Sequence, residues 1–303
     1  MIPTLNKKTN HYRSHKRAII TRNVFVYIFL IIISVIWLIP FVYLIFQSLS
    51  SIYSPSNFMP ALPTEENINA GLPVFTFDNY VNLFTNVNYP FWRWYLNTLV
   101  ISLITMVIQT ILVLGTSYAL SRLRFKGRQG IMRLILVLGM FPGFLSTIII
   151  YFTLQLLHME SNIFSLILIY IASSAMQYYI AKGFFDTIPK SLDEAAMIDG
   201  ANKNTIFFKI IMPLSKPIIV YTMLISFTSP WGDFMTASII AGGNPSMMTV
   251  AVGLQQMITL TQRVAMFPTF CAGGVVVAIP IMILFFWLQK YYVEGITGGA
   301  VKG

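Results

Sequence analysis

The sequence predicts an all-α membrane protein with six transmembrane helices and a polar helix-turn-helix between the fourth and the fifth. Of its 303 residues, 56% are hydrophobic and 10% are charged, and the mean hydropathy is +0.72. An ordinary soluble domain is far less apolar. Several uncharged runs reach the length of about 20 residues that crosses a bilayer. The second half of the chain has one long polar interruption, at 189–217.

Basic residues are distributed very unevenly along these spans. The chain has 20 Lys and Arg against 10 Asp and Glu, a net charge of +10. With a cytoplasmic amino terminus, only Arg93 and Arg263 of these basic residues fall outside, which leaves eighteen on the cytoplasmic side. Cytoplasmic loops of membrane proteins carry such an excess. We therefore predict that both termini are cytoplasmic, and no surplus of charge remains to indicate a nucleic-acid partner.

The first part of the chain is a basic tail at 1–23, without an acidic residue, followed by an uncharged run at 24–47. The run is long enough to cross a bilayer and lacks the short apolar core and small-residue cleavage site of a signal peptide. We interpret it as the first transmembrane helix. The polar, Pro- and Asn-rich stretch at 48–93 is then an extracellular loop, so that 24–93 holds the first helix and its loop.

The remaining apolar runs predict five more transmembrane helices, at 94–120, about 131–154, about 162–181, 217–240 and 266–288. The third contains Gly139, Pro142 and Gly143, whose small residues and proline predict a close helix approach or a kink. Together these helices form a transmembrane domain at 94–289. A Gly-rich cytoplasmic tail follows at 290–303.

The polar element at 189–217 has helix signals of its own. Pro189 ends the preceding helix, and Ser191 with Glu194 fits a capping box. A short helix is therefore expected at about Leu192–Asp199. Gly200 suits the left-handed conformation that ends many helices.

A second helix is expected to begin after Asn202 or Asn204 and to stop at Pro213, which has no amide hydrogen to continue it. The product is a helix-turn-helix with the small residues Ala195 and Ala196 on one side. Three interpretations are open: a docking element for another protein, an amphipathic pair lying on the membrane surface, and a DNA-reading motif. A transmembrane helix directly on each side leaves little room for DNA.

The residues of this element carry a resemblance to a known family. They read Glu194-Ala195-Ala196-Met197-Ile198-Asp199-Gly200-Ala201, followed by Ile210, Pro213 and Pro217. This pattern resembles the EAA loop of ABC importer permeases. The likeness covers most of the chain and is closest to the carbohydrate-uptake branch, the six-helix maltose/maltodextrin permeases. Its other segments are Asn97-Thr98, Phe184 to Pro189, Pro230 to Phe234, Thr249 to Gln256 and the tail from Gly295 to Gly303.

The resemblance implies a heteromeric importer embedded in the lipid of a bacterial cell membrane. Its other members would be a second homologous permease, two cytoplasmic ATPase subunits and an extracellular sugar-binding protein. The sequence has no G-x-x-x-x-G-K-[ST] phosphate loop. We therefore expect this chain to be no enzyme and to bind no cofactor, with ATP and Mg held by the partner ATPase.

The resemblance also assigns roles to named residues. In the ATPase-coupling loop, Glu194 would make polar contacts, Ala195 and Ala196 would allow close approach, and Gly200 would permit the reversal. The remaining coupling residues implied by the motif are Asp199, Ile210 and Pro213. The Gly-rich tail would insert between the ATPase subunits through Gly298, Gly299 and Lys302, unless it is frayed and inert.

A substrate pathway is expected near Asp233, the acidic residue that lies within a predicted apolar span. A charge at bilayer depth costs ~2.5–3.5 kcal/mol on insertion scales, so the carboxylate should face protein or water. Gly232 can break the helix beside it, and Trp231 offers a flat face for a sugar ring. Alternatively, Asp233 caps or pairs locally near the outer interface. Tyr151 and Tyr178 are weaker pathway candidates.

Two function classes follow. The first is the permease subunit of an ATP-driven importer, which forms half of the pathway for an oligosaccharide, either a malto-oligosaccharide or another one. The second is an ion-coupled secondary transporter or a membrane enzyme. Secondary transport favours several ionisable residues within the spans. A metal enzyme needs ligand spacing, which His11, His15 and His158 lack. The sequence favours the importer.

Overall fold

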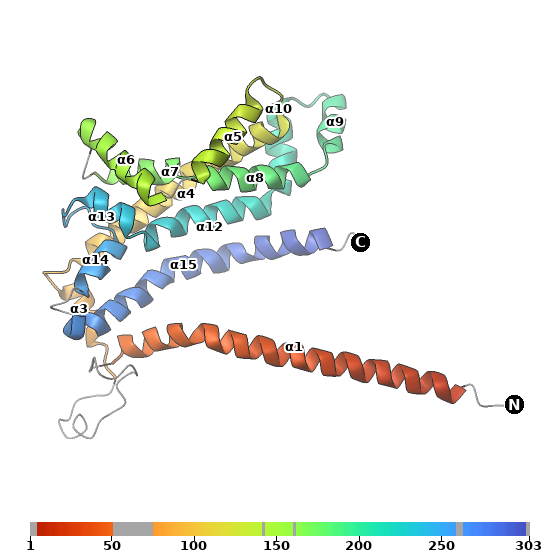
Figure 1. Ribbon diagram of the computed structural model, residues 1–303, viewed down its shortest axis with the longest axis horizontal. Helices are drawn as coiled ribbons and strands as arrows, with labels where there is room; N and C mark the ends of the chain where they lie inside the picture. Colours follow the sequence, from red (N-terminus) through yellow and green to blue (C-terminus); the bar gives the residue numbers. More distant parts are fainter. Residues whose placement is uncertain (1–4, 51–74, 141–142, 160–161, 259–262, 301–303) are drawn as a thin grey trace.

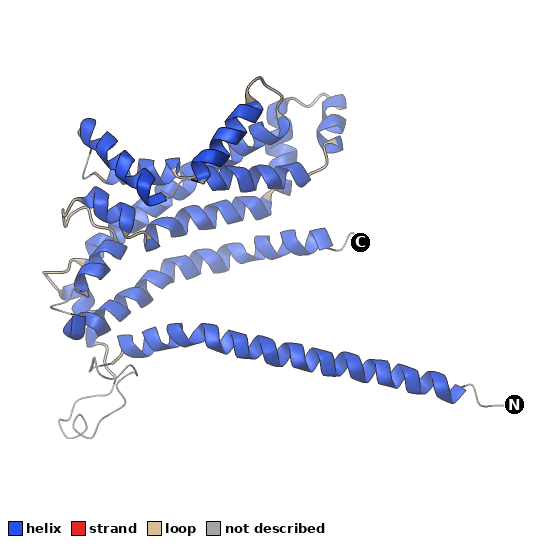
Figure 2. Ribbon diagram, in the orientation of Figure 1, coloured by secondary structure: helices blue, strands red, loops and turns tan. Residues whose placement is uncertain are grey.

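The computed structural model describes all residues except 1–4, 51–74, 141–142, 160–161, 259–262 and 301–303 (Figure 1). Within those described ranges the secondary structure is helical, apart from one isolated bridge between Ser50 and Phe75 (Figure 2). The helices are α1 (Leu5–Ser48), α3 (Asp78–Thr85), α4 (Phe91–Arg122), α5 (Arg128–Gly139), α6 (Gly143–Leu156), α7 (Ile163–Ala172), α8 (Ala175–Thr187), α9 (Ser191–Ile198), α10 (Lys203–Thr205), the π-helical η1 (Ile206–Ile211), α11 (Met212–Leu214), α12 (Lys216–Gly232), α13 (Met235–Ala241), α14 (Val250–Met257) and α15 (Arg263–Ala300).

The helices give the molecule two distinct ends (Figure 1). The amino-terminal end of α1, the carboxyl-terminal end of α15 and the short helix α9 point toward one end. Helices α3 and α14 lie at the other end, where α1 and α15 come together before they diverge. The polar element therefore lies toward the same end as the start of α1 and the end of α15, and the cytoplasmic location of that end stays a prediction.

Three helices are long and apolar enough to cross a membrane without interruption: Thr21–Ser48, Phe91–Arg122 and Met266–Tyr291. Two bent helix pairs bring the candidate spans among the described residues to five if each pair is counted as one span: α7 with α8, bent by 41°, and the α10–α11 segment with α12, bent by 80°. The helix expected at about 131–154 is divided into α5 and α6, and the one expected at 217–240 into α12 and α13. The structure therefore confirms the all-α membrane fold. Three of the expected helices are divided, two of them near Gly139 and Gly232, where the sequence predicted a kink and a break.

The break after α5 lies where small residues predicted a close approach. A Cβ placed on Gly139 would lie 3.5 Å from Cβ of Ala175, so α5 comes into contact with the start of α8. Glycine allows helix backbones to approach in this way. Pro142, the predicted source of a kink, lies outside the described residues. The close approach is confirmed, and α5 and α8 meet near the breaks in their respective spans.

A row of polar side chains along α4 compensates for interruptions in other helices. Gln109 donates its side-chain amide to the carbonyl of Tyr170, 2.9 Å away, near the end of α7. Asn97 donates to the carbonyls of Ser246 and Met248, both at 3.0 Å. The hydroxyl of Thr98 accepts from the amide of Val250, at the start of α14. A bilayer offers no water to such groups, so each needs an internal partner.

Hydrophobic packing forms two separate cores. The first joins α4 to α7, α12 and α14 through large buried residues such as Trp94, Tyr170 and Trp231. The second lies nearer α9 and joins Tyr118 of α4 to Phe185 of α8 and to the α9–η1 segment. Along α4 the first core extends to Met106 and the second begins at Val113, and the buried polar residues Gln109 and Thr110 lie between them.

The ends of the chain are more helical than expected. Helix α1 begins at Leu5, so most of the predicted basic tail at 1–23 continues the first transmembrane helix. Helix α15 runs to Ala300 and includes most of the Gly-rich segment. Glycine costs about 1 kcal/mol relative to alanine within a helix, which is too little to stop a helix that is already formed. Two short helices, α3 and α14, lie in segments that were expected to be loops.

Substitution of Gly253 is expected to destabilise the first core. A Cβ at this position would lie 2.0 Å from Cε3 of Trp94, whose side chain is 1% exposed. Overpacking of this kind costs about 1–3 kcal/mol. Gly253→Ala should therefore lower the melting temperature of the detergent-solubilised protein. The matched control is Gly115→Ala in α4, where a Cβ meets nothing within 4 Å. Equal melting temperatures for the two variants would contradict this packing.

Candidate functional site

Helix α9 begins one residue earlier than the sequence pattern predicts. Lys190 is its N-cap residue and has helical backbone angles, φ −68° and ψ −22°. The amides of Asp193 and Glu194 bond to the carbonyl of Lys190, and α9 has no side-chain cap. The predicted capping box of Ser191 and Glu194 is therefore wrong, because Ser191 already lies inside the helix.

The turn after α9 has the predicted chemistry. Gly200 has φ +83°, the left-handed conformation. Its amide bonds to the carbonyl of Met197, and the amide of Ala201 bonds to the carbonyl of Ala196 at 2.9 Å. Asn202 then accepts hydrogen bonds from the amide and the hydroxyl of Thr205. The reversal at Gly200 is confirmed, and the second helix begins after Asn202.

The second helix does not stop at Pro213 as predicted. It continues from η1 through α11 to Leu214 and turns sharply at Ser215 into α12. The π-helical turn bonds the amide of Met212 to the carbonyl of Phe207, five residues earlier. Proline clashes with the carbonyl four residues before it in a regular α-helix. The wider π turn relieves this clash and carries the helix past Pro213.

Helix α9 exposes most of its surface, including apolar side chains. Ala196 is its buried side chain and joins the second core. Glu194, Ala195 and Asp199 are exposed. The sequence analysis missed three exposed apolar residues of this helix, Leu192, Met197 and Ile198, the last of which is 86% exposed. The spacing of three residues from Leu192 to Ala195 to Ile198 is a signal that could have found this apolar face.

We call the exposed residues Leu192, Glu194, Ala195, Met197 and Ile198 the α9 surface. It combines apolar side chains with one carboxylate at the end of the molecule toward which α1 and α15 extend (Figure 1). Exposed apolar residues clustered on a small element mark interaction sites. The two other residues named for coupling lie behind it, with Ile210 half-buried against the second core and Pro213 exposed.

Asp233 lies at the break between α12 and α13 and has two partners. Its Oδ2 accepts from the hydroxyl of Tyr170 at 3.1 Å, and its Oδ1 accepts from the amide of Thr236 at 3.0 Å. The second bond satisfies one of the free amides at the start of α13. The backbone carbonyl of Tyr170 is held by Gln109, so this tyrosine connects α4, α7 and the break. The helix ends at Gly232, close to the position that the sequence indicated.

The aromatic pathway candidates are packed into the cores. Trp231 is 4% exposed, and its ring is flanked by Tyr95 at 5.3 Å and Phe227 at 5.9 Å between centroids. It has no free face for a sugar in this conformation. Tyr151 of α6 is half-buried against the first core, whereas Tyr178 of α8 packs against the second. The structure therefore places Trp231 beside Asp233 but keeps Tyr178 away from both.

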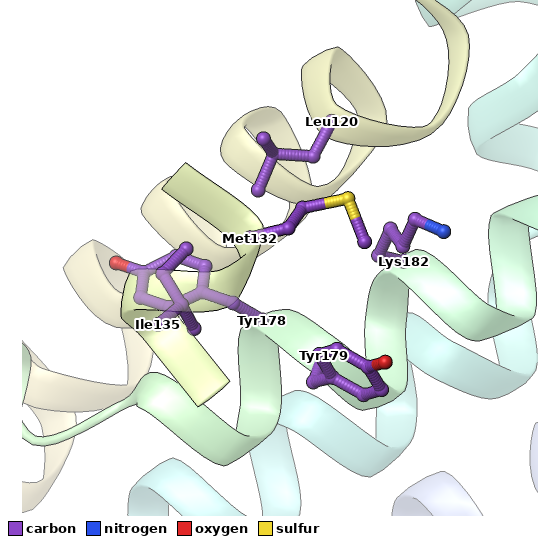
Figure 3. Close-up of a pocket in the computed structure, with 6 residues that line it drawn as sticks. All are labelled: Leu120, Met132, Ile135, Tyr178, Tyr179 and Lys182. Carbon is purple, nitrogen blue, oxygen red and sulfur yellow. The ribbon is translucent and has the colours of Figure 1, made fainter. Parts of the chain in front are cut away.

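Tyr178 lines a small pocket among α4, α5 and α8 (Figure 3). The pocket has room for about one water molecule, which is too little for a sugar ring. The other lining residues come from the same three helices: Leu120, Met132, Ile135, Tyr179 and Lys182.

In the tail, Gly298 and Gly299 lie in the last turn of α15, and Lys302 is outside the described residues. Among the described residues, no group of three or more His, Cys, Asp or Glu could hold a metal.

Comparison with known proteins identifies similar sequences and a similar fold. Residues 111–298 match the family model described as "Binding-protein-dependent transport system inner membrane component". A galactooligosaccharides transport system permease protein of Bacillus subtilis is 41% identical over 75% of this chain and 81% of its own. A maltodextrin transport system permease protein of Streptococcus pneumoniae is 34% identical over 91% of this chain and 94% of its own.

A solved structure gives the same fold. It is the crystal structure of a bacterial ABC transporter involved in the import of the acidic polysaccharide alginate. The match has a TM-score of 0.70 and 24% sequence identity, and it covers 92% of this chain and 98% of the other. At this level of identity the likeness concerns the fold.

Removal of the Asp233 carboxylate is expected to destabilise the break between α12 and α13. Asp233→Ala deletes a helix cap and leaves the hydroxyl of Tyr170 without its acceptor, which should cost about 1–2 kcal/mol. The matched variant Asp233→Asn retains an oxygen acceptor and should keep most of the stability. Thermal melting of both variants in detergent measures the difference. An alanine variant as stable as the wild type would show that the cap is unimportant.

Proposed function

The chain belongs to the family of binding-protein-dependent transport system inner membrane components, and we propose that it is the permease subunit of an ATP-driven oligosaccharide importer. In such a system it forms half of the translocation pathway. The α9 surface carries this proposal, because it projects from the membrane helices on a short helix-turn-helix and exposes apolar side chains that the described part of the chain leaves uncovered.

The α9 surface is the docking site for a cytoplasmic ATPase subunit. Leu192, Met197 and Ile198 supply the apolar contact, and Glu194 supplies a polar one. Ala195 permits close approach, whereas Ala196 anchors α9 to the second core. The sequence contains no phosphate loop of its own, so ATP and Mg are bound by the partner. The complete importer contains two ATPase subunits, a second permease and an extracellular sugar-binding protein.

The orientation follows from charge and from the placement of α9. Both termini and α9 are cytoplasmic, whereas α3 and α14 face the outside of the cell. The excess of Lys and Arg on the α9 side supports this assignment.

The substrate is an oligosaccharide. Two relatives named for maltodextrin transport support a malto-oligosaccharide, one at 34% identity over 91% of this chain and one at 38% over 76%. A second candidate is a galacto-oligosaccharide, supported by the relative at 41% identity. The break at Asp233, where backbone groups become free near a polar side chain, is the part of this chain that we place nearest the sugar pathway.

Transport proceeds by a change of helix tilt. When the ATPase subunits close on ATP they displace α9, which is connected directly to α8 and, through η1, to α12. The bends between α7 and α8 and between α11 and α12 allow the two ends of these helices to move by different amounts. The pathway then opens alternately to the two sides of the membrane.

Uptake of labelled sugars tests the function and its substrate. In cells that lack only this chain, the plasmid-borne gene should restore ATP-dependent uptake of labelled maltotriose, and labelled galactotriose is compared in parallel. Restoration of galactotriose uptake alone would assign the second substrate. Uptake that persists without the ATPase subunit and disappears when the proton gradient is collapsed would instead establish ion-coupled transport and contradict the proposal.

The docking role of the α9 surface is tested by Ile198→Glu. Ile198 is 86% exposed, so the variant should insert and fold normally. An unpaired charge in the docking contact should reduce the amount of ATPase that co-purifies in mild detergent by roughly tenfold. The control is Val87→Glu, which should retain the ATPase. Val87 is an exposed aliphatic residue in the segment that follows α3, and α3 lies at the end of the molecule opposite α9 (Figure 1). Full retention by Ile198→Glu would remove α9 from the contact.

A further inference from the structure

The guanidinium of Arg122 bridges three helices at the base of α9. Its Nη2 donates to the carbonyl of Phe185 at 2.9 Å and to that of Ile188 at 2.6 Å. Its Nη1 lies 3.3 Å from Oδ2 of Asp193. Phe185 and Ile188 end α8, Asp193 is in the first turn of α9, and Arg122 is the last residue of α4. The side chain is 4% exposed, so these contacts are shielded from water.

The two carbonyls explain why an arginine is needed here. The last carbonyls of a helix lack helical partners, and a positive charge is favourable at this end of the helix dipole. Arginine offers several donors in a rigid fork, and lysine offers a single ammonium group. One guanidinium can therefore hold the end of α8 and the beginning of α9 at the same time. The angle between these helices is set by a side chain that belongs to α4.

Few other interactions fix α9 in the described part of the chain. Ala196 is the buried side chain of this helix, and Asp193 supplies its ion pair. Helix α9 stands away from the bundle in Figure 1. The hydroxyl of Ser121 donates to Asp186 at 2.6 Å, which adds a second contact between the ends of α4 and α8. A push on α9 therefore reaches α4 by the side chain of Arg122.

In the described part of the chain, the ion pair between Arg122 and Asp193 leaves some of its hydrogen-bonding atoms without a partner. Nε and Nη1 of Arg122 and Oδ1 of Asp193 are buried and have no hydrogen-bond partner among the described residues. Arginine and carboxylate groups form two parallel hydrogen bonds when their planes align. In this structure Nη1 of Arg122 lies 3.3 Å from Oδ2 of Asp193, and the second parallel hydrogen bond is not formed.

We propose that Arg122 is a positioning residue for transport, which holds α9 against α8 and α4 so that displacement of α9 tilts the membrane helices. This inference rests on the proposed docking of an ATPase to the α9 surface and deepens it. Arg122 does not belong to the α9 surface, because its side chain is buried behind that helix. It therefore governs transmission of the movement rather than binding of the partner.

The test is the number of sugar molecules transported per ATP hydrolysed by the complete importer in proteoliposomes. Arg122→Met should assemble with the ATPase and still hydrolyse ATP, while transport per ATP falls at least about fivefold, in the range of ordinary coupling between sites. Arg122→Lys should recover part of the loss. The matched control is Arg124→Met, which removes an exposed charge two residues away and should leave the ratio unchanged.

A purely structural role predicts a different result. The amount of assembled Arg122→Met complex would then fall, but the ratio in the complex that remains would equal that of the wild type, which would overturn the proposal. If Arg122→Met does not assemble, Asp193→Asn provides the second measurement, because it keeps the size of the side chain and removes its charge. A normal ratio for Asp193→Asn would likewise overturn the proposal, and a reduced ratio would support it.

The wild-type measurement separates this proposal from the proposed function. A wild-type complex that contains no ATPase, or that transports no oligosaccharide, would contradict the importer itself. A wild-type complex that couples ATP hydrolysis to transport, together with normal ratios in both variants, would contradict only the role of Arg122.

Discussion

The structure depends on side chains of α4 that hydrogen-bond to backbone groups of other helices. Within a bilayer a broken helix leaves free carbonyls and amides that no water can reach. Helix α4 is continuous from Phe91 to Arg122 and supplies partners at three levels: Asn97 and Thr98 at α14, Gln109 at the end of α7, and Arg122 at the end of α8. Because α4 supplies these partners, the backbone carbonyls of Tyr170, Phe185 and Ile188 and the amide of Val250 are hydrogen-bonded where the neighbouring helices begin or end.

In this arrangement α4 is one continuous helix, whereas the spans around it are bent or broken. Each of the two hydrophobic cores includes part of α4, and the buried polar residues Gln109 and Thr110 lie between these two parts. Close packing makes each core resist deformation, so movement is concentrated where the helices bend. Tyr170 lies in the first core and donates a hydrogen bond to Asp233 at the break between α12 and α13, whereas Ala196 and Phe185 lie in the second core. The bends therefore lie between α9, where the ATPase is proposed to dock, and the break at Asp233, which is proposed to lie nearest the sugar pathway.

The sequence predicts the positions of the helices and two of the three interruptions, those near Gly139 and Gly232, but not the bend between α7 and α8. Apolar length alone locates the spans, and the local chemistry of Gly200 and Asn202 gives the turn after α9, because both signals are contained in a few neighbouring residues. The bend at Ser173 and Ser174 has no proline or glycine and depends on Gln109, 61 residues from the carbonyl that it binds. Likewise, Trp231 is buried against Tyr95 of α4. The guanidinium of Arg122 has its partners on α8 and α9. Such contacts arise only when distant segments meet.

The left-handed turn at Gly200 also constrains how this sequence can diverge. Nothing lies within 4 Å of a Cβ added there, so the restriction comes from the backbone and is independent of side-chain volume. Among replacements, asparagine tolerates the left-handed conformation best, and β-branched residues tolerate it least. Related sequences that keep the chain reversal should therefore carry glycine or asparagine at this position. The range of residues accepted at position 200 is therefore limited by its φ angle, even though this position is exposed to solvent.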